Sequence, residues 1–191
     1  MSESSLVHSL QLAPHPEGGY FRRTHENSRT VPCPFPEEGP GSTRLASTSI
    51  HYLLTPASPI GHFHRNKALC YHFHHRGRGR YRLIGEQGEV DEFVVGPDVA
   101  AGEKLMWAVE GGVWKSSELI VGDGDGDGDG DGGGEGLLIS EVVVPGFEFR
   151  DHEFLDWERL QALVGPERAG QLRPFLKPGQ DCAAGSGGGS A

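Results

Sequence analysis

Hydrophobic and polar positions alternate in short segments along most of the chain, which is the pattern of β-strands and not of helices. Turns rich in Gly and Pro separate the segments, as at residues 55–56, 77–79 and 85–88. No helical pattern of ten residues interrupts them, so parallel strands joined by helices are excluded. The sequence therefore predicts an all-β protein with antiparallel strands in a jelly-roll β-barrel. The main predicted strands are 20–24, 44–55, 61–65, 69–75, 79–85, 89–96, 103–109, 112–121 and 137–145.

Helical patterns occur only near the two ends of the strand region. Residues 4–12 place Leu6 and Leu10 at helical spacing after a serine that can cap a helix. Near the other end, Asp156 can cap a helix over 157–164, and Gly165-Pro166 stops it before a second short helix. We expect these short peripheral helices to pack against the outside of the barrel.

Length and composition indicate one domain. The 191 residues are enough for one full hydrophobic core, and residues 1–183 are expected to form it. Two low-complexity tracts stand apart, a Gly-Asp repeat at 122–136 and a Gly/Ser tail at 184–191, and both are expected to be disordered. The uniform alternation of Gly and Asp lacks the ligand positions of a calcium-binding loop, so no calcium site is predicted there.

Charge and cysteine usage exclude several function classes. The net charge is -10, and the six acids of the Gly-Asp repeat leave -4 for the rest of the chain. Without a basic stripe, nucleic-acid binding is not expected. Three scattered cysteines show no disulfide spacing, and no apolar stretch reaches the roughly 20 residues that span a bilayer. The sequence predicts a cytoplasmic protein with no membrane partner.

The stretch Gly61–Arg65 carries the most distinctive chemistry. Residues two apart on a strand share a face, so His62 and His64 are expected to project together into the barrel and Phe63 to the other side. On the next strand, the same reasoning places Tyr71 and Phe73 inside. Cys70, His72 and His74 are then expected on the outer face, where they would form a surface or subunit-interface patch.

These histidines also carry a family resemblance. The stretches 12–24, 49–56, 61–66, 94–103, 109–117 and 142–155 resemble, in order and spacing, the uncharacterised cupin-5 branch of the cupin superfamily. The resemblance covers most of residues 6–176 and implies the cupin fold. It implies no specific activity, because that branch has none to transfer.

Metal binding is where the chain departs from the cupin signature. The two motif histidines match His62 and His64, but the acid falls at Leu69 and the last histidine at Trp114 or Lys115. No metal cofactor is therefore expected. The alternative is a site for Fe²⁺, Mn²⁺ or Zn²⁺ made by His62, His64 and His51, because imidazoles are ligands that suit these ions.

A small molecule inside the barrel is the predicted partner. Its expected contacts are apolar and polar side chains, with an inward Arg22 favouring an anionic group. The candidate ligand-binding residues are Arg22, His62, Tyr71, Phe73 and Trp114, although the aromatic ones could equally be core.

Three functions remain open at this stage. The first is a metal-independent isomerase or epimerase acting on a small polar or sugar-like metabolite, with His64, His51 and Tyr20 as the catalytic residues. The second is a metal-dependent cupin dioxygenase, and the third is a binding protein without catalysis. In each case a homodimer is expected.

Overall fold

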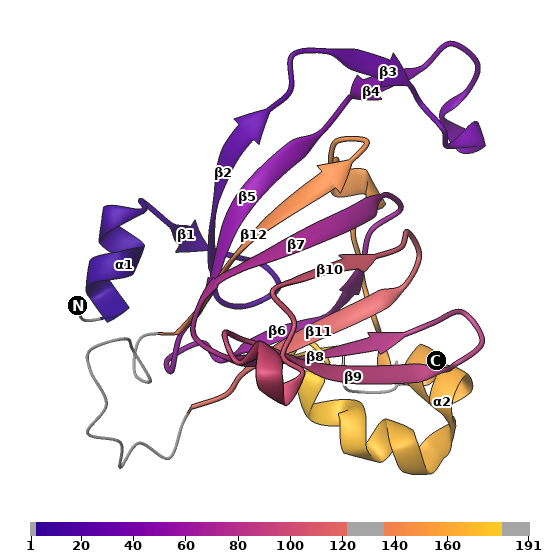
Figure 1. Ribbon diagram of the computed structural model, residues 1–191. Coiled ribbons are helices and arrows are strands. Elements are labelled where there is room, and N and C mark those ends of the chain that lie inside the picture. Colours follow the sequence, from indigo (N-terminus) through magenta and orange to yellow (C-terminus); the bar gives the residue numbers. More distant parts are fainter. Residues whose placement is uncertain (1–2, 122–135, 181–191) are drawn as a thin grey trace, which may run out of the picture.

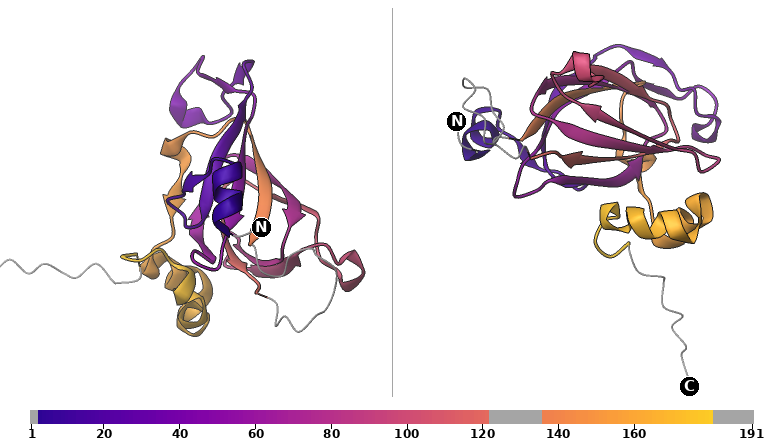
Figure 2. Two further views of the ribbon diagram at one scale, coloured as in Figure 1. Left: turned by 90° about the vertical axis from the view of Figure 1, so that its left-hand side faces the viewer. Right: turned by 60° about the horizontal axis from the view of Figure 1, so that its bottom comes forward.

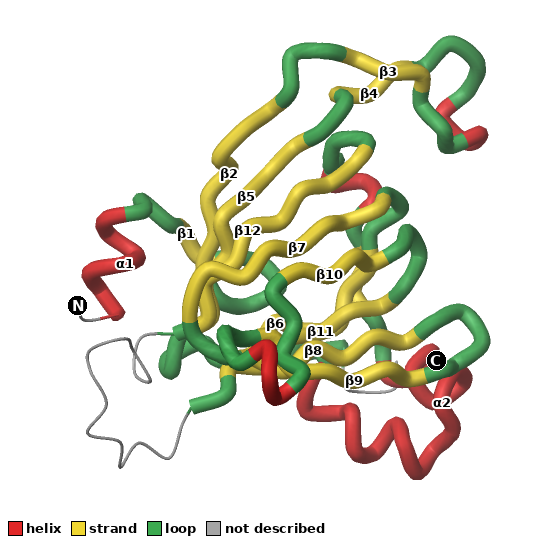
Figure 3. Tube along the Cα trace, in the orientation of Figure 1, coloured by secondary structure: helices red, strands yellow, loops and turns green. Residues whose placement is uncertain are grey.

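The computed structural model describes residues 3–121 and 136–180, and in this part of the chain β-strands predominate over helices (Figure 1, Figure 3). The predicted Gly/Ser tail lies outside the described residues, as does the Gly-Asp repeat apart from Gly136.

Two antiparallel sheets and one small hairpin contain all the named strands. The first sheet has the order β1 (Ala13–Pro14), β2 (Tyr20–Glu26), β5 (Thr48–Leu54), β12 (Leu137–Val144), β7 (Leu69–Arg76) and β10 (Met106–Val109). The second sheet has the order β13 (Glu153–Phe154), β6 (Ile60–Arg65), β11 (Trp114–Leu119), β8 (Gly79–Ile84) and β9 (Val90–Val95). A separate hairpin of β3 (Thr30–Pro32) and β4 (Thr43–Leu45) extends beyond the first sheet (Figure 1). The predicted all-β antiparallel jelly roll is confirmed as two facing sheets around a common interior (Figure 2).

The helices are peripheral, as predicted. Helix α1 (Glu3–Ser9) lies beside the first sheet, and α2 (Trp157–Leu172) lies outside the second (Figure 2). The Asp156 side chain accepts a hydrogen bond from the Arg159 N–H and so caps α2, while Gly165, at φ 78°, interrupts it. Single 3-10 turns occur at Pro36–Glu38, Val99–Ala101, Phe149–Asp151 and Arg173–Phe175. Among the described helices, none has the length and apolar character needed to cross a membrane.

Apolar side chains pack in two main layers. One fills part of the interior between the sheets and includes Tyr52, Tyr81 and Trp107. The other joins the outer face of the second sheet to α2 and includes Phe63 and Trp114. This interior layer does not fill the whole space between the sheets. Polar side chains occupy the remaining part, and the candidate site lies among them.

A β-bulge in β6 corrects the predicted direction of one histidine. On β11, Lys115 pairs with His64 and Ser117 with Gly61, so two residues of β6 lie opposite one residue of β11. His64 consequently points into the interior. The His62 ring lies instead next to Phe175 and Lys177 of the C-terminal segment, so the expectation that the two rings share a face is wrong.

The faces of β7 are also opposite to the prediction. Cys70 and His72 are buried in the interior, at 2% and 0% exposure. Tyr71 is half-buried and Phe73 is 39% exposed, both on the outer side. Apolar character therefore does not identify the inner face here, because the interior contains a buried network of charged groups.

Candidate ligand and metal site

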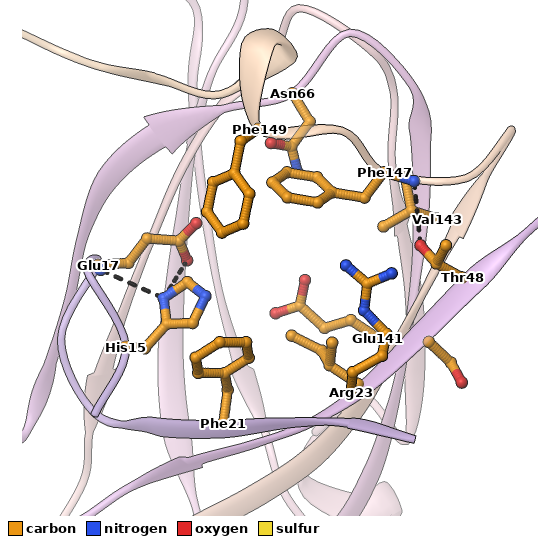
Figure 4. A pocket seen from close by; sticks show the side chains of 12 residues that line it. His15, Glu17, Phe21, Arg23, Thr48, Asn66, Glu141, Val143, Phe147 and Phe149 are labelled. Atoms are coloured by element: carbon orange, nitrogen blue, oxygen red, sulfur yellow. Dashed lines mark hydrogen bonds and ion pairs between the residues drawn. The ribbon is translucent and has the colours of Figure 1, made fainter. Parts of the chain in front are cut away.

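A pocket opens between the two sheets and takes its walls from several separate segments (Figure 4). Its apolar lining is Phe21, Ile50, Val143, Phe147 and Phe149. Its polar lining is His15, Glu17, Arg23, Thr48, Ser49, Asn66 and Glu141. Apolar walls with a few converging polar groups are typical of small-ligand sites.

The turn at residues 15–19 holds Glu17 at one side of this pocket. The Glu17 carbonyl accepts a hydrogen bond from the His62 N–H at 2.7 Å, and the Tyr52 hydroxyl donates to the Gly18 carbonyl at 2.9 Å. Gly18 has a φ of 99°, and a Cβ atom there would lie 2.1 Å from the Ile60 carbonyl oxygen. Only glycine fits, so the sequence Pro16–Gly19 is adapted to bring an acid against β6.

Glu17 contacts two histidines from distant parts of the chain. Its Oε2 lies 3.1 Å from His64 Nε2, and its Oε1 lies 2.8 Å from His152 Nε2. The two imidazoles stack with ring centroids 5.3 Å apart and planes 12° apart. All three side chains are largely buried, at 9%, 6% and 11% exposure. The turn before β2, strand β6 and the segment after β12 thus meet at one point.

The proton arrangement at His64 is fixed by a backbone carbonyl. His64 Nδ1 lies 2.8 Å from the His62 carbonyl oxygen, which can only accept, so Nδ1 carries a proton. Burial lowers the pKa of His64 to about 4 despite the nearby Glu17 charge, so the ring is neutral near pH 7. Burial opposes the Glu17 charge, but the imidazoles around it hold its pKa down at about 2. Nε2 and Oε2 therefore face each other as two acceptors.

A second buried cluster lies on β7, β11 and β12. The ammonium of Lys115 donates to Glu141 Oε2 at 2.9 Å, to His72 Nε2 at 3.0 Å and to Cys70 Sγ at 3.5 Å. The His72 ring stacks on Trp107, with centroids 5.0 Å apart. Although burial opposes its charge, the Cys70 and Glu141 side chains raise the pKa of Lys115, and Lys115 in turn lowers that of Glu141. The pair is therefore charged.

These two clusters differ in their fitness for a metal ion. Each brings three possible ligand atoms within 4.8 Å of one another. In the Cys70, His72 and Glu141 group, the Lys115 ammonium already contacts all three atoms, so a metal ion does not fit. In the Glu17, His64 and His152 group, two imidazole nitrogens and a carboxylate converge, which is a donor set that suits a transition metal.

Of the residues predicted from the sequence to form the site, His64 alone reaches it. The Arg22 side chain is exposed and donates to the Leu10 carbonyl, whereas its neighbour Arg23 lines the pocket. The others lie elsewhere: Tyr20 against α1, His51 beside His75, His62 beside Phe175, Tyr71 and Phe73 on the outer face, and Trp114 under α2. The alternative metal set of His62, His64 and His51 is therefore not assembled.

The residues missed from the sequence come mainly from turns and irregular segments. Glu17 follows a proline and precedes two glycines, a tight-turn signal that could have singled it out. His152 has no comparable signal, since it follows a single 3-10 turn and lies 135 positions from its partner Glu17.

Comparison with known proteins agrees with the architecture. The family model described as "Cupin superfamily (DUF985)" matches residues 4–155. The chain is 44% identical over 177 residues to Uncharacterized protein YML079W of Saccharomyces cerevisiae, covering 90% of this chain and 84% of that protein.

Two solved structures are similar over almost their whole length. One is a hypothetical protein from Leishmania major, with a TM-score of 0.76 and 29% identity, covering 92% of this chain and 99% of the other. The second is protein SO0799 from Shewanella oneidensis, with a TM-score of 0.72 and 26% identity, covering 93% and 99%. None of these names assigns a substrate.

Proposed function

Because the chain belongs to the cupin superfamily, in the branch described as DUF985, we propose that it binds a small organic anion between its two sheets. The observation that carries this proposal is Arg23. Its Nε is buried with no hydrogen-bond partner among the described residues, and its side chain lines the pocket (Figure 4). Nη1 contacts the exposed Glu26 at 2.8 Å. An anionic group on the ligand would satisfy Nε.

The remaining polar groups favour a ligand that also carries hydroxyl groups. His15 Nδ1 accepts from the Glu17 N–H, so its proton is on Nε2, and burial lowers the pKa of His15, which keeps the ring neutral. Glu141 supplies an acceptor held in place by Lys115. One donor, one acceptor and one cation in an apolar pocket suit a sugar acid or a sugar phosphate, in line with the sugar-like metabolite predicted from the sequence.

Replacement of Arg23 by methionine is expected to weaken the binding of such an anion at least about 10-fold, which corresponds to about 1.4 kcal/mol. Titration calorimetry with gluconate and glucose 6-phosphate measures the change. Arg22→Met is the matched control, because the neighbouring arginine points away from the pocket. Equal losses in both variants, or binding of neutral glucose as tightly as of the anions, would contradict the proposal.

Two reaction classes are compatible with a ligand held there. A metal-independent isomerase or epimerase, the class predicted from the sequence, would keep a proton between Glu17 and His64 and exchange it with the ligand. A metal-dependent cupin enzyme would hold a cation at Glu17, His64 and His152, and that ion would polarise the ligand as a Lewis acid. The specific observation favouring the second is that a carboxylate and two imidazoles from separate segments converge at this point.

We also propose that the protein is cytoplasmic and forms a homodimer, and that the exposed apolar face of the first sheet is the contact. Phe73, Met106 and Val144 are 39%, 47% and 39% exposed, and Met106 is the cross-strand partner of Phe73. Cys70 and His72, which the sequence placed in this contact, are buried in the interior and take no part.

The double variant Phe73→Glu/Met106→Glu is expected to convert a two-chain particle into a single chain, because four carboxylates would be buried in the contact. Light scattering coupled to size exclusion measures the mass. Val99→Glu changes an exposed apolar residue elsewhere, at 59% exposure, and should leave the mass unchanged. A single-chain mass for the unmodified protein would refute the dimer.

A further inference from the structure

We propose that Glu17, His64 and His152 bind one divalent first-row transition-metal ion through a carboxylate oxygen and the two Nε2 atoms. The proposal concerns the end of the pocket next to Glu17 and goes beyond the binding of an organic anion, on which it does not depend. The three residues lie far apart in the sequence, so no local motif brings any two of them together.

The spacing of the donor atoms fits an ion. Zn–N and Zn–O bonds of about 2.1 Å place ligand atoms about 3.0 Å apart at right angles and about 3.4 Å apart in a tetrahedron. Glu17 Oε2 lies 3.1 Å from His64 Nε2 and Glu17 Oε1 lies 2.8 Å from His152 Nε2, and one ligand atom from each residue lies within 4.8 Å of the other two. Two imidazoles and one carboxylate on a single ion are the donor set of many iron, zinc and manganese sites.

The orientation of the His64 ring also fits a cation. His64 donates its Nδ1 proton to the His62 carbonyl, so that its Nε2 lone pair is directed at Glu17. Hydrogen bonds made by the ring nitrogen that does not bind the metal orient metal-bound histidines and fix their tautomer. An ion at this point would contact both the Glu17 carboxylate and His64 Nε2, which lie 3.1 Å apart in a buried environment.

The charge balance of the interior also favours a cation next to Glu17. Two of the buried acids, Glu17 and Glu141, line the pocket, and Lys115 neutralises Glu141 through direct contact. The side chains in direct contact with Glu17 are the imidazoles of His15, His64 and His152. A divalent ion would compensate the Glu17 charge, as Lys115 compensates that of Glu141.

The lysine cluster provides an internal comparison. Its three acceptors surround Lys115 Nζ. Lys115 itself lies on β11 as the cross-strand partner of His64. Lys115 is one of the two positions at which the last histidine of the cupin signature falls, and there the chain carries its own cation. The acid missing at Leu69 is replaced by Glu17, which reaches the site from the turn before β2 rather than from β7.

The test uses full-length protein without a histidine tag, stripped of metal with a chelator and titrated with Zn²⁺ and with Co²⁺. We expect one ion per chain, and a visible Co²⁺ absorption band characteristic of nitrogen ligation. Glu17→Gln and His152→Gln should each weaken Zn²⁺ binding at least about 100-fold. Loss of a residue that binds the ion directly costs more affinity than loss of a residue that only hydrogen-bonds to such a ligand. Circular dichroism verifies folding, and His152→Gln serves if Glu17→Gln does not fold.

Matched controls separate this site from its alternatives. His51→Gln and His62→Gln should leave Zn²⁺ affinity unchanged, because neither ring reaches the cluster. Arg23→Met should lose anion binding and keep Zn²⁺, so that the two proposals fail separately. No stoichiometric binding of either ion, or unchanged affinity in both Glu17→Gln and His152→Gln, would overturn the metal site.

Discussion

Replacement of Lys115 by methionine is expected to lower the free energy of unfolding by about 3–5 kcal/mol, because removing one partner of a buried ion pair leaves the other charge uncompensated. Lys115 is 3% exposed and donates to Glu141, His72 and Cys70. Methionine has nearly the same length and flexibility, so the loss reports charge and hydrogen bonding more than volume. Urea denaturation followed by fluorescence of the tryptophans measures it.

The loss should also depend on pH in a defined direction. Although burial opposes its charge, the unmodified protein holds the pKa of Glu141 well below its usual value, through Lys115 and then His72. Without Lys115, burial dominates and raises the Glu141 pKa above that of the unfolded chain. The folded variant then binds more protons than the unfolded one, so its stability falls as pH rises from about 4.5 through the raised pKa.

The matched control is Lys115→Met/Glu141→Gln, which removes both charges of the pair. It should recover a large part of the lost stability, and the stability difference between it and Lys115→Met should grow between pH 5 and pH 8. A Lys115→Met loss that is small, or that shows no pH dependence relative to the double variant, would mean that Glu141 is not held charged by Lys115.

Much of the fold was predictable because turns and alternation act locally. The Gly-Pro and Gly-Gly turns mark the ends of strands, and the absence of long helical patterns leaves only antiparallel sheets. The cap at Asp156 and the break at Gly165 were readable for the same reason, since each depends on a few neighbouring residues.

The site was less predictable because three nonlocal features decide it. The bulge at His62 and Phe63 changes the parity of β6 and has no composition signal of its own. The inner face of β7 carries Cys70 and His72, so the rule that apolar residues lie inside selects the wrong face. Finally, Glu17 and His64 meet only because a glycine turn packs against β6.

The second large effect is expected at Arg44, whose side chain is fully buried and joins three segments. Its guanidinium contacts both carboxylate oxygens of Asp151 and also Glu38, and it lies 4.8 Å from the centre of the Phe35 ring. Asp151 is 2% exposed. Arg44→Leu should therefore lower the free energy of unfolding by about 3 kcal/mol, because Asp151 would be left buried and uncompensated by its closest partner.

Loss of Arg44 should also affect ligand binding, because Asp151 lies next to residues of the site in the sequence. It ends the 3-10 turn Phe149–Asp151, and His152 comes directly after it. Loss of the Arg44 contact should loosen both the pocket wall at Phe149 and the position of His152, and so weaken Zn²⁺ and anion binding, although Arg44 touches neither site. Arg44→Lys keeps the charge without the two-pronged contact and should give an intermediate loss, measured by urea denaturation and calorimetry. Arg44→Leu could instead be less stable and still bind Zn²⁺ and gluconate with unchanged affinity. The contact of Arg44, on the β3–β4 hairpin, would then stabilise the fold without positioning the site.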